Sequence, residues 1–498
     1  MTPLAVADPG TLVQSVDWVA IAPPLVAALA GLVVLVADLF LKGSQKKALS
    51  WLAIGGLTAA LAALLPLALG SGTRSTFCLA DGGCSYTADH FALAFQLLAL
   101  GGALIAALLS AHTVDKDGLP AGEYWFLLLS SAAGAALLPA ARDLATLIVA
   151  LEVASLPAFA LVALRRDGRG AEAALKFFLS SVTATAVMLL GVSFVYAATG
   201  TLHLSAIAEA LTTAPGQLKH LAEAGAVLTL VGFAFKTAAV PFHFWVPDTY
   251  VGAPVPVAGY LSVVGKAAGL AGLALVTTVA FRPYGHTWGL VLAVLAAVTM
   301  TAGNVAALRQ RAAAPNGAVR LLAWSSVSQA GYLLVPLAAA GYAGDDHPVG
   351  ATVAYALVYG VVNLGAFAVV AATGHSRLDD FQGLFARNRW AALALAFFLL
   401  CLAGLPPGVV GLFGKVVVFR AAVDAGLGWL AVVMAVNVVV ALYYYLTWTA
   451  KLFATAPEAP RTRIPGPLTA TLALTASVAA VLSVAPQLVL QVVSGTLF

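Results

Sequence analysis

Apolar residues run along this chain in long blocks, and short polar segments separate the blocks. A helical block of roughly 18 or more apolar residues can cross the ~30 Å hydrocarbon layer of a membrane. The pattern therefore predicts an all-α polytopic membrane protein with about fourteen transmembrane helices. The predicted spans are 18–41, 50–70, 90–112, 123–141, 144–164, 172–198, 222–247, 255–280, 287–308, 318–341, 350–373, 390–420, 427–451 and 467–493.

The composition excludes an ordinary soluble domain. Of the 498 residues, 61% are hydrophobic and 9% are charged, whereas soluble domains carry about 25% charged residues.

An even number of spans places both termini on one side of the membrane. With the N-terminus outside, sixteen of the 25 Lys and Arg residues fall in cytoplasmic segments and five fall in outer segments. Because basic residues concentrate on the cytoplasmic side, both termini are predicted to lie outside.

The three cysteines bear on the redox environment and on cofactors. Cys78 and Cys84 share the 71–89 loop, which this orientation places in the oxidising compartment, so a disulfide between them is predicted. Cys401 lies within a span and is expected to pack as a small apolar residue. The sequence contains no CxxC pair and no haem or nucleotide motif, so we expect this chain to bind no cofactor.

Five charged residues within the spans are costly, because an unpaired charge in the bilayer costs from about 3 to more than 10 kcal/mol. Glu152 and Lys266 are central to their spans, and Lys236 lies in mid-span just before Pro241. Each of them either has a functional role or only locks one helix to another, and Glu152 can also be a neutral, hydrogen-bonded glutamic acid. For the remaining two, Lys176 and Lys415, a third alternative is open, because their stems can reach toward the membrane surface.

Prolines interrupt two of the predicted spans. Pro241 and Pro247 break the seventh span, and Pro406-Pro407 break the twelfth. A proline frees backbone carbonyls that lipid cannot satisfy, so such breaks are tolerated where they line a polar cavity or are buried in protein. A lysine lies close to each break, where free carbonyls and water can solvate it.

The two broken spans are five spans apart, which predicts an internal repeat. Spans four to eight and spans nine to thirteen form two five-helix units, and an odd number of helices makes successive units inverted. The predicted division is an N-terminal three-helix segment at 1–122, a first inverted repeat at 123–280, a second at 281–452, and a C-terminal helix at 453–498.

The buried charges are suited to proton transfer. Burial favours the neutral form of a lysine and a neighbouring carboxylate favours its charged form, so moving the carboxylate switches the charge. Glu152 is the only carboxylate deep in any predicted span, and it can act on either Lys176 or Lys236. Together with Lys266 and Lys415, Lys236 would form a hydrated row at mid-membrane depth.

Other polar residues allow two interpretations each. His243 can relay protons, or it can only cap a helix beside the Pro247-Asp248 turn. The polar residues of span ten either hold water or join helices to one another. They are Ser325, Ser326, Ser328 and Gln329.

Three long motifs of this chain resemble the antiporter-like, proton-pumping membrane subunits of respiratory complex I. They are FKTAAVPFHFWVPDTYVGAPVPVAGYLSVVGKAA, LLAWSSVSQAGYLL and LAGLPPGVVGLFGK. The resemblance covers spans four to thirteen, and in helix count it extends to all fourteen. It implies that Glu152 and Lys236 form the coupled pair of the first half, that Lys266 is the central relay, and that Lys415 acts in the second half. Lys176 matches the lysine that the family carries in span six.

The chain departs from its relatives at several positions. Val251 stands before Gly252-Ala253-Pro254, where many relatives have Glu, and Gln329 stands where many have His. Subunits L and M of this family typically carry a histidine in an S-x-L-L-H-A stretch after GAPVPV, which this chain lacks. Subunit M also typically has a glutamate at the position of Lys415. If span ten conducts protons in this chain, it does so through water.

The resemblance implies a subunit that moves protons across a bacterial inner membrane. The outer side, on which the Lys and Arg distribution places both termini, is then the periplasm. Its partners would be the antiporter-like neighbours and the small membrane subunits of complex I, the lipid bilayer and, at a higher level, a respiratory supercomplex. No nucleic acid is expected. NADH, FMN, iron–sulfur clusters and quinone would be bound by partner subunits, and quinone reduction there would supply the energy.

Three alternatives remain. The first is a subunit of a multisubunit Na⁺/H⁺ antiporter, which has the same fold. The second is a non-conducting structural membrane subunit whose charges only lock helices together. A stand-alone solute transporter has weak support, because nothing in the sequence outlines a substrate pocket.

Overall fold

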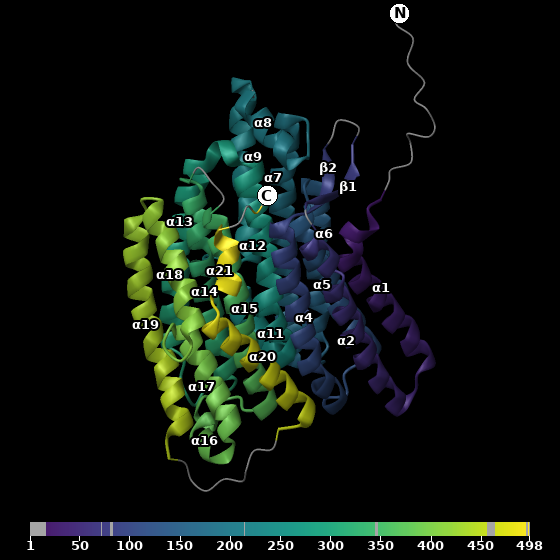
Figure 1. Cartoon of the computed structure of the whole chain (residues 1–498), viewed down its shortest axis with the longest axis vertical. Coiled ribbons are helices and arrows are strands. Elements are labelled where there is room, and N and C mark those ends of the chain that lie inside the picture. Colours follow the sequence, from purple (N-terminus) through teal and green to yellow (C-terminus); the bar gives the residue numbers. More distant parts are fainter. Residues whose placement is uncertain are drawn as a thin grey trace, which may run out of the picture.

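The computed structural model describes residues 16–70, 72–79, 83–213, 215–343, 347–455, 464–494 and 497. Within these residues the protein is a bundle of helices with one short β-hairpin at one end (Figure 1). The two termini, and Arg461 and Arg463 of the charge count, lie outside the described residues.

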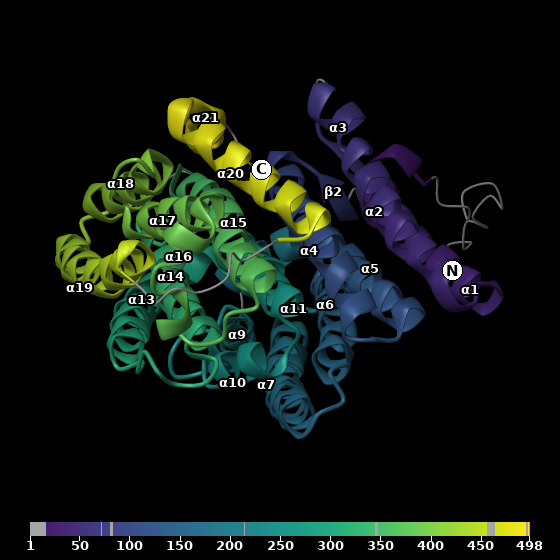
Figure 2. The same ribbon diagram turned by 90° about the horizontal axis from the view of Figure 1, so that it is seen from below.

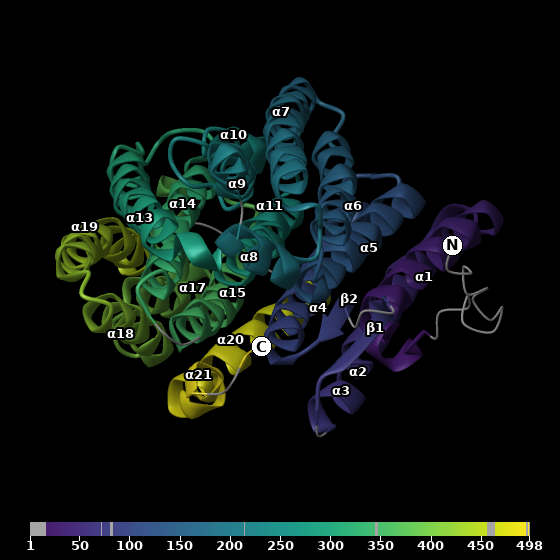
Figure 3. The same cartoon turned by 90° about the horizontal axis from the view of Figure 1, so that it is seen from above.

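The first group of elements forms one edge of the bundle. Figures 2 and 3 show α1 and α2 along this edge, with α4 nearer the centre. The helices are α1 (Trp18–Phe40), α2 (Lys47–Ala62), α3 (Leu65–Leu69) and α4 (His90–Lys116), and the strands are β1 (Arg74–Cys78) and β2 (Cys84–Ala88).

The second group follows as α5 (Ala121–Leu137), α6 (Leu144–Ala163), α7 (Gly168–Thr199), α8 (Leu204–Thr213), α9 (Gly216–Lys236), α10 (Trp245–Gly252), α11 (Val255–Tyr260) and α12 (Lys266–Leu275). A π-helical turn, Leu261–Gly265, joins α11 to α12. The third group is α13 (Gly285–Leu308), α14 (Gly317–Ala340), α15 (His347–Thr373), α16 (Leu384–Arg387), α17 (Arg389–Ala403), α18 (Val409–Asp424), α19 (Gly428–Phe453), α20 (Gly466–Val484) and α21 (Gln487–Ser494).

The predicted class, an all-α polytopic membrane protein, is confirmed. Among the described residues, 13 helical segments are long and apolar enough to cross a membrane. They correspond to all of the predicted spans except 390–420, which is divided into α17 and α18. The last predicted span, 467–493, is also divided, because α20 ends at Val484 and α21 begins after Pro486.

Helix burial separates the centre of the bundle from its lipid-facing edge. In an 18-residue apolar stretch of α14, 94% of the residues are buried, whereas in the corresponding stretch of α20 only 28% are buried. Exposed residues on the outer helices are mostly large and apolar, such as Leu32 on α1 and Val439 on α19. Such a surface is unfavourable in water and suits a hydrocarbon solvent.

The break in the seventh predicted span lies between Lys236 and Trp245. α9 ends at Lys236, well before Pro241. The prediction that Pro247 interrupts a helix is wrong, because Pro247 lies in the first turn of α10. At that position the backbone nitrogen has no intrahelical acceptor, so a proline there removes no hydrogen bond from the helix.

The break in the twelfth predicted span lies between α17 and α18. α17 ends at Ala403 and is capped by Gly404, whose φ of 84° lies in the left-handed region that glycine adopts readily. Pro406 and Pro407 follow, and α18 starts at Val409. The Val240–Pro241 and Pro406–Pro407 peptide bonds are both cis.

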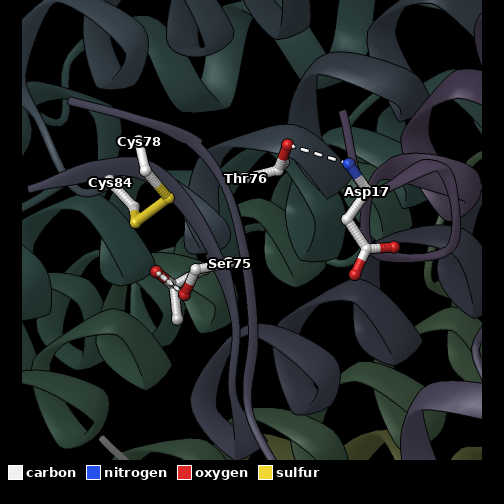
Figure 4. The surroundings of a disulfide bond; sticks show 6 residues. Asp17, Ser75, Thr76, Cys78 and Cys84 are labelled. Carbon is white, nitrogen blue, oxygen red and sulfur yellow. Dashed lines mark hydrogen bonds between the residues drawn. A yellow bond between two sulfur atoms is a disulfide. The ribbon is translucent and has the colours of Figure 1, made fainter. Parts of the chain in front are cut away.

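The segment 71–89, expected to be a loop, contains an antiparallel hairpin of β1 and β2. A disulfide joins Cys78 to Cys84 (Figure 4). The backbone nitrogen of Asp17, the residue that caps α1, donates to the Thr76 hydroxyl at 3.0 Å. The hairpin therefore holds the start of α1 through this hydrogen bond.

Asp89 and Arg142 form a buried ion pair beneath this hairpin. Asp89 also caps α4, and Arg142 donates to the carbonyls of Pro139 and Ala141. Burial raises the pKa of the Asp89 carboxyl, while the neighbouring guanidinium acts in the opposite direction. The pair thus connects the hairpin, α4 and the turn between α5 and α6.

Candidate functional site

Lys236 is the last residue of α9 and is buried where three other helices meet. Its ammonium donates to the hydroxyl of Ser155 on α6 and to that of Ser181 on α7, each at 2.8 Å. α12 closes the third side through Gly269, where a Cβ atom would lie 2.8 Å from the carbonyl carbon of Lys236. A larger residue than glycine would therefore push α12 away from the lysine.

Glu152 on α6 is the carboxylate beside this lysine. Glu152 Oε1 lies 3.6 Å from Lys236 Nζ, within ion-pair range but too far for a direct hydrogen bond. The Thr185 hydroxyl of α7 donates to the same oxygen at 2.8 Å. The carboxylate is 24% exposed and the lysine side chain 7% exposed. Of the two lysines open to Glu152, the structure thus places Lys236 beside it.

Lys176 belongs to a different cluster, at one end of α7. Its side chain is 49% exposed and contacts Glu172 at 2.6 Å and Asp248 at 3.0 Å. Arg320 of α14 lies 3.5 Å from the other oxygen of Asp248. Asp248 thus joins charges from three helices. The sequence indicates only a turn at Pro247-Asp248, although an acid beside the break of a broken helix is a signal of such a cluster.

A small cavity lies beside Lys236, between α6 and the π-helical turn. Its volume is about 30 Å³, and Ser131, Ser155, Tyr260 and Gly265 are among its lining residues. That volume has room for about two water molecules, and hydroxyl groups supply the polar partners that water requires. The Tyr260 hydroxyl donates to Ser131 at 2.8 Å. The cavity therefore extends from Lys236 to the residue that precedes Lys266.

Lys266 opens α12 directly after the π-helical turn and is 1% exposed. Its ammonium donates to the Ser326 hydroxyl at 2.6 Å and also to the Ser326 carbonyl. The Tyr359 hydroxyl of α15 donates to the same serine oxygen at 2.8 Å. Ser326, one of the polar residues of predicted span ten, is therefore the direct partner of this lysine.

The other polar residues of α14 contact tyrosines. Gln329 accepts a hydrogen bond from Tyr355 on α15 and donates to Tyr445 on α19 at 3.3 Å. The Tyr445 hydroxyl also lies 2.6 Å from that of Ser325. Ser328 and Tyr332 bury hydroxyls for which the described residues provide no hydrogen-bond partner. Such atoms are the usual binding sites of buried water.

Lys415 on α18 lies at the second break. Its ammonium donates to the carbonyls of Leu402 and Ala403, at 2.7 and 2.8 Å, at the end of α17. It also lies 5.6 Å from the centre of the Tyr332 ring. A cation at the carboxyl end of a helix is favoured by the helix dipole. Carbonyls freed by the break hold this lysine as expected, whereas Lys236 is held by hydroxyls.

His243 lies within the first break. Its ring is 5.5 Å from that of Trp324, and its buried Nδ1 has no hydrogen-bond partner among the described residues. α10 starts with no side-chain cap, so the structure does not support a capping role for His243.

Among the described residues, no group of three or more His, Cys, Asp and Glu side chains has an arrangement that could hold a metal ion.

The sequence and fold of the chain match known proteins over nearly its full length. The family described as "NADH:quinone oxidoreductase/Mrp antiporter, TM" matches residues 141–441. The chain is 65% identical to "NADH-quinone oxidoreductase subunit N 2" of Streptomyces griseus, over 99% of this chain and 96% of that protein. The chain belongs to the family of NADH-quinone oxidoreductase subunit N.

Solved structures agree with this membership. A chain of respiratory complex I from Thermus thermophilus is 33% identical to this one, with a TM-score of 0.78, and covers 94% of this chain and 98% of that one. A chain of the Mrp complex from Dietzia sp. DQ12-45-1b has a TM-score of 0.82 at 21% identity, over 96% of each chain. The second likeness shows a shared fold only. Subunit N and the Mrp chain thus use one helical architecture.

Proposed function

We propose that this chain moves protons across the bacterial inner membrane as a membrane subunit of an NADH:quinone oxidoreductase. Quinone reduction in partner subunits, which would bind NADH, FMN, iron–sulfur clusters and quinone, supplies the energy. The partners are the other membrane subunits, both the antiporter-like neighbours and the small ones. Family membership supports the assembly, and the pair of the buried Lys236 and the partly exposed Glu152 carries the proposal for this chain.

The first step takes place at that pair. Two unit charges about 4 Å apart interact by on the order of 4 kcal/mol at an effective dielectric constant of about 20. Neutralising Glu152 or drawing it away removes this attraction, and the buried ammonium of Lys236 then favours release of its proton. The hydroxyls of Ser155 and Ser181 hold the nitrogen in place in both charge states. Both accept from the ammonium; in the neutral amine an N–H still donates to Ser155, whose own proton goes to the Leu151 carbonyl, while the Ser181 hydroxyl can donate to the single lone pair.

The second step passes the charge toward the centre of the bundle. Water in the 30 Å³ cavity receives the proton beside Lys236 and hands it on at the π-helical turn before Lys266. From Lys266 onward, Ser326 and the tyrosines around Gln329 form a polar route toward Lys415. Gln329 cannot itself take up a proton, so it orients tyrosines and water.

The proposal includes an internal symmetry and an orientation. Residues 123–280 and 281–452 act as two inverted half-channels, each with its own broken helix and lysine. Both termini lie on the periplasmic side, which places the Lys176–Asp248 cluster at the cytoplasmic face. The same-fold alternative, an Na⁺/H⁺ antiporter subunit, is supported by a family description that names both classes of protein and by the Mrp fold likeness at 21% identity. The 65% identity to a subunit N favours the oxidoreductase.

The deciding experiment is Lys236→Ala in the assembled complex, in inverted membrane vesicles. We expect NADH-driven acidification of the vesicles to be lost while the complex still assembles. Lys219→Ala is the matched control, because Lys219 lies on the same helix and is exposed. Full acidification by a correctly assembled Lys236→Ala complex would favour the alternative in which the charges only lock helices. Purification of the chain with antiporter subunits and without redox subunits would favour the antiporter.

A further inference from the structure

A large open groove separates α20 from α16 and the start of α17. Its volume is about 1180 Å³. Figures 1 and 2 show that α20 crosses the bundle obliquely, so that its Gly466 end lies away from α17. The groove shares no lining residue with the cavity beside Lys236. It therefore needs an occupant of its own.

One wall of the groove is a smooth apolar slot. On α20 the lining residues Thr469, Ala473, Ala476 and Ala480 recur every three or four positions, and so share one helix face. They extend over about 16 Å at 1.5 Å per residue. Leu393, Ala394 and Phe397 of α17 are among the lining residues opposite. A slot of this length and chemistry fits an extended hydrocarbon chain.

The other end of the groove is basic. Arg387 and Arg389 both line it, and no described lining residue is acidic. The Arg389 guanidinium carbon lies 5.3 Å from the ring of Trp390, which is 70% exposed. Arg387 donates to the carbonyls of Asp380 and Gln382, while its buried Nε has no partner among the described residues. Two arginines beside an exposed tryptophan are typical of a membrane interface that binds an anionic headgroup.

We propose that this groove binds one anionic phospholipid, with its phosphate at Arg389 and one acyl chain along the small residues of α20. The slot accounts for the chain, and the two positive charges account for the anionic headgroup. The acyl chain of a zwitterionic lipid would fill the slot equally well. Its headgroup has no net charge, so it would not neutralise the positive charges of the two arginines. The assignment does not depend on the direction or the mechanism of proton transfer.

The test uses the intact complex, purified in mild detergent, stripped of lipid and titrated with phosphatidylglycerol or phosphatidylcholine, with native mass spectrometry as the readout. Arg389→Gln should weaken phosphatidylglycerol binding by about fivefold, the contribution of one basic residue near an anionic lipid, and leave phosphatidylcholine unchanged. Arg420→Gln is the control, because Arg420 is an 80% exposed arginine on α18 outside the groove. Equal lipid binding by these two variants would overturn the proposal.

A second variant tests the slot and not the charge. Ala476→Trp should fill the slot and weaken binding of both lipids, whereas Ala470→Trp, on an exposed part of α20 that does not line the groove, should not. Unchanged binding by Ala476→Trp would overturn the proposal. So would efficient cross-linking of Ala473→Cys to a neighbouring subunit in native membranes, because the groove would then be covered by protein.

Discussion

Lys236 Nζ lies 3.6 Å from Glu152 Oε1 but only 2.8 Å from the hydroxyls of Ser155 and Ser181. The carboxylate thus acts on the lysine mainly through its charge, and the hydroxyls fix the position of the nitrogen. This division of roles is what a switch requires, because the charge can be removed without losing the geometry.

Replacement of Glu152 by glutamine tests that switch. Glutamine retains the shape and can still accept from Thr185, but it leaves the buried ammonium without a countercharge. Removing one partner of a fully buried pair costs about 3–5 kcal/mol, and the cost is smaller here because the Glu152 side chain is 24% exposed. Lys236 then becomes neutral, and its charge no longer alternates. Proton pumping by the assembled complex should fall by about tenfold or more, as measured by NADH-driven acidification of inverted vesicles.

The control for this substitution is Glu209→Gln, because Glu209 is an exposed glutamate on α8. It should leave pumping unchanged. Wild-type pumping by an assembled Glu152→Gln complex would show that the charge of Glu152 is not part of the switch.

Hydropathy alone predicted the helices because long apolar blocks have few alternatives in lipid. It also placed the breaks within a few residues, because a proline excludes a continuous helix. The hairpin at 74–88 was missed, since five-residue strands with alternating polar residues, such as those around Phe77 and Tyr86, resemble an ordinary loop. The division of the last span before Pro486 was missed because the apolar block continues through it.

The partners within the site could be predicted only in part. The residues by themselves left both Lys176 and Lys236 open as the partner of Glu152, and only the family resemblance implied Lys236. The choice depends on helix rotation and depth, which composition does not encode. Ser155 and Ser181 were missed as partners of Lys236, because the hydroxyl of a serine in a membrane helix usually forms a hydrogen bond within its own helix. Ser155 does so, donating to the Leu151 carbonyl at 2.7 Å, and its oxygen still accepts from Lys236.

Asp248 is the next residue to test, because it joins Lys176 to Arg320. Asp248→Asn removes the negative charge that holds the two cations together, and the local excess of positive charge then slows proton uptake. We expect the pumping rate to fall by a factor of roughly two to ten, with a marked dependence on ionic strength. Stability should change little, because exposed ion pairs contribute little to it.

The matched control is Asp424→Asn, which removes another exposed acid paired with an arginine, Arg420, away from this cluster. The two variants would be compared by initial acidification rates in low and high salt. Identical rates for both would exclude a role of Asp248 in proton entry.

Lys415 combines a structural and a proposed conducting role, and two substitutions separate them. Lys415→Met removes the donors to Leu402 and Ala403, and each unsatisfied buried carbonyl costs about 1–3 kcal/mol, so the complex should unfold at a lower temperature and fail to pump. Lys415→Arg keeps the donors and the charge, but a guanidinium does not release its proton at accessible pH. It should retain thermal stability and lose pumping, and normal pumping by Lys415→Arg would assign Lys415 to structure alone.

The disulfide of the hairpin allows the orientation to be measured. If the termini and the hairpin are periplasmic, a membrane-impermeant phosphine followed by an impermeant maleimide should label Cys78 and Cys84 in intact spheroplasts, and only after reduction. Cys401 is buried and should stay unlabelled. Ser44→Cys, at an exposed position between α1 and α2, should react only after the membrane is permeabilised. The reverse pattern would have Ser44→Cys labelled in intact spheroplasts and the hairpin cysteines unlabelled, and it would show the opposite orientation. The Lys176–Asp248 cluster would then lie at the periplasmic face and would serve proton release instead of uptake.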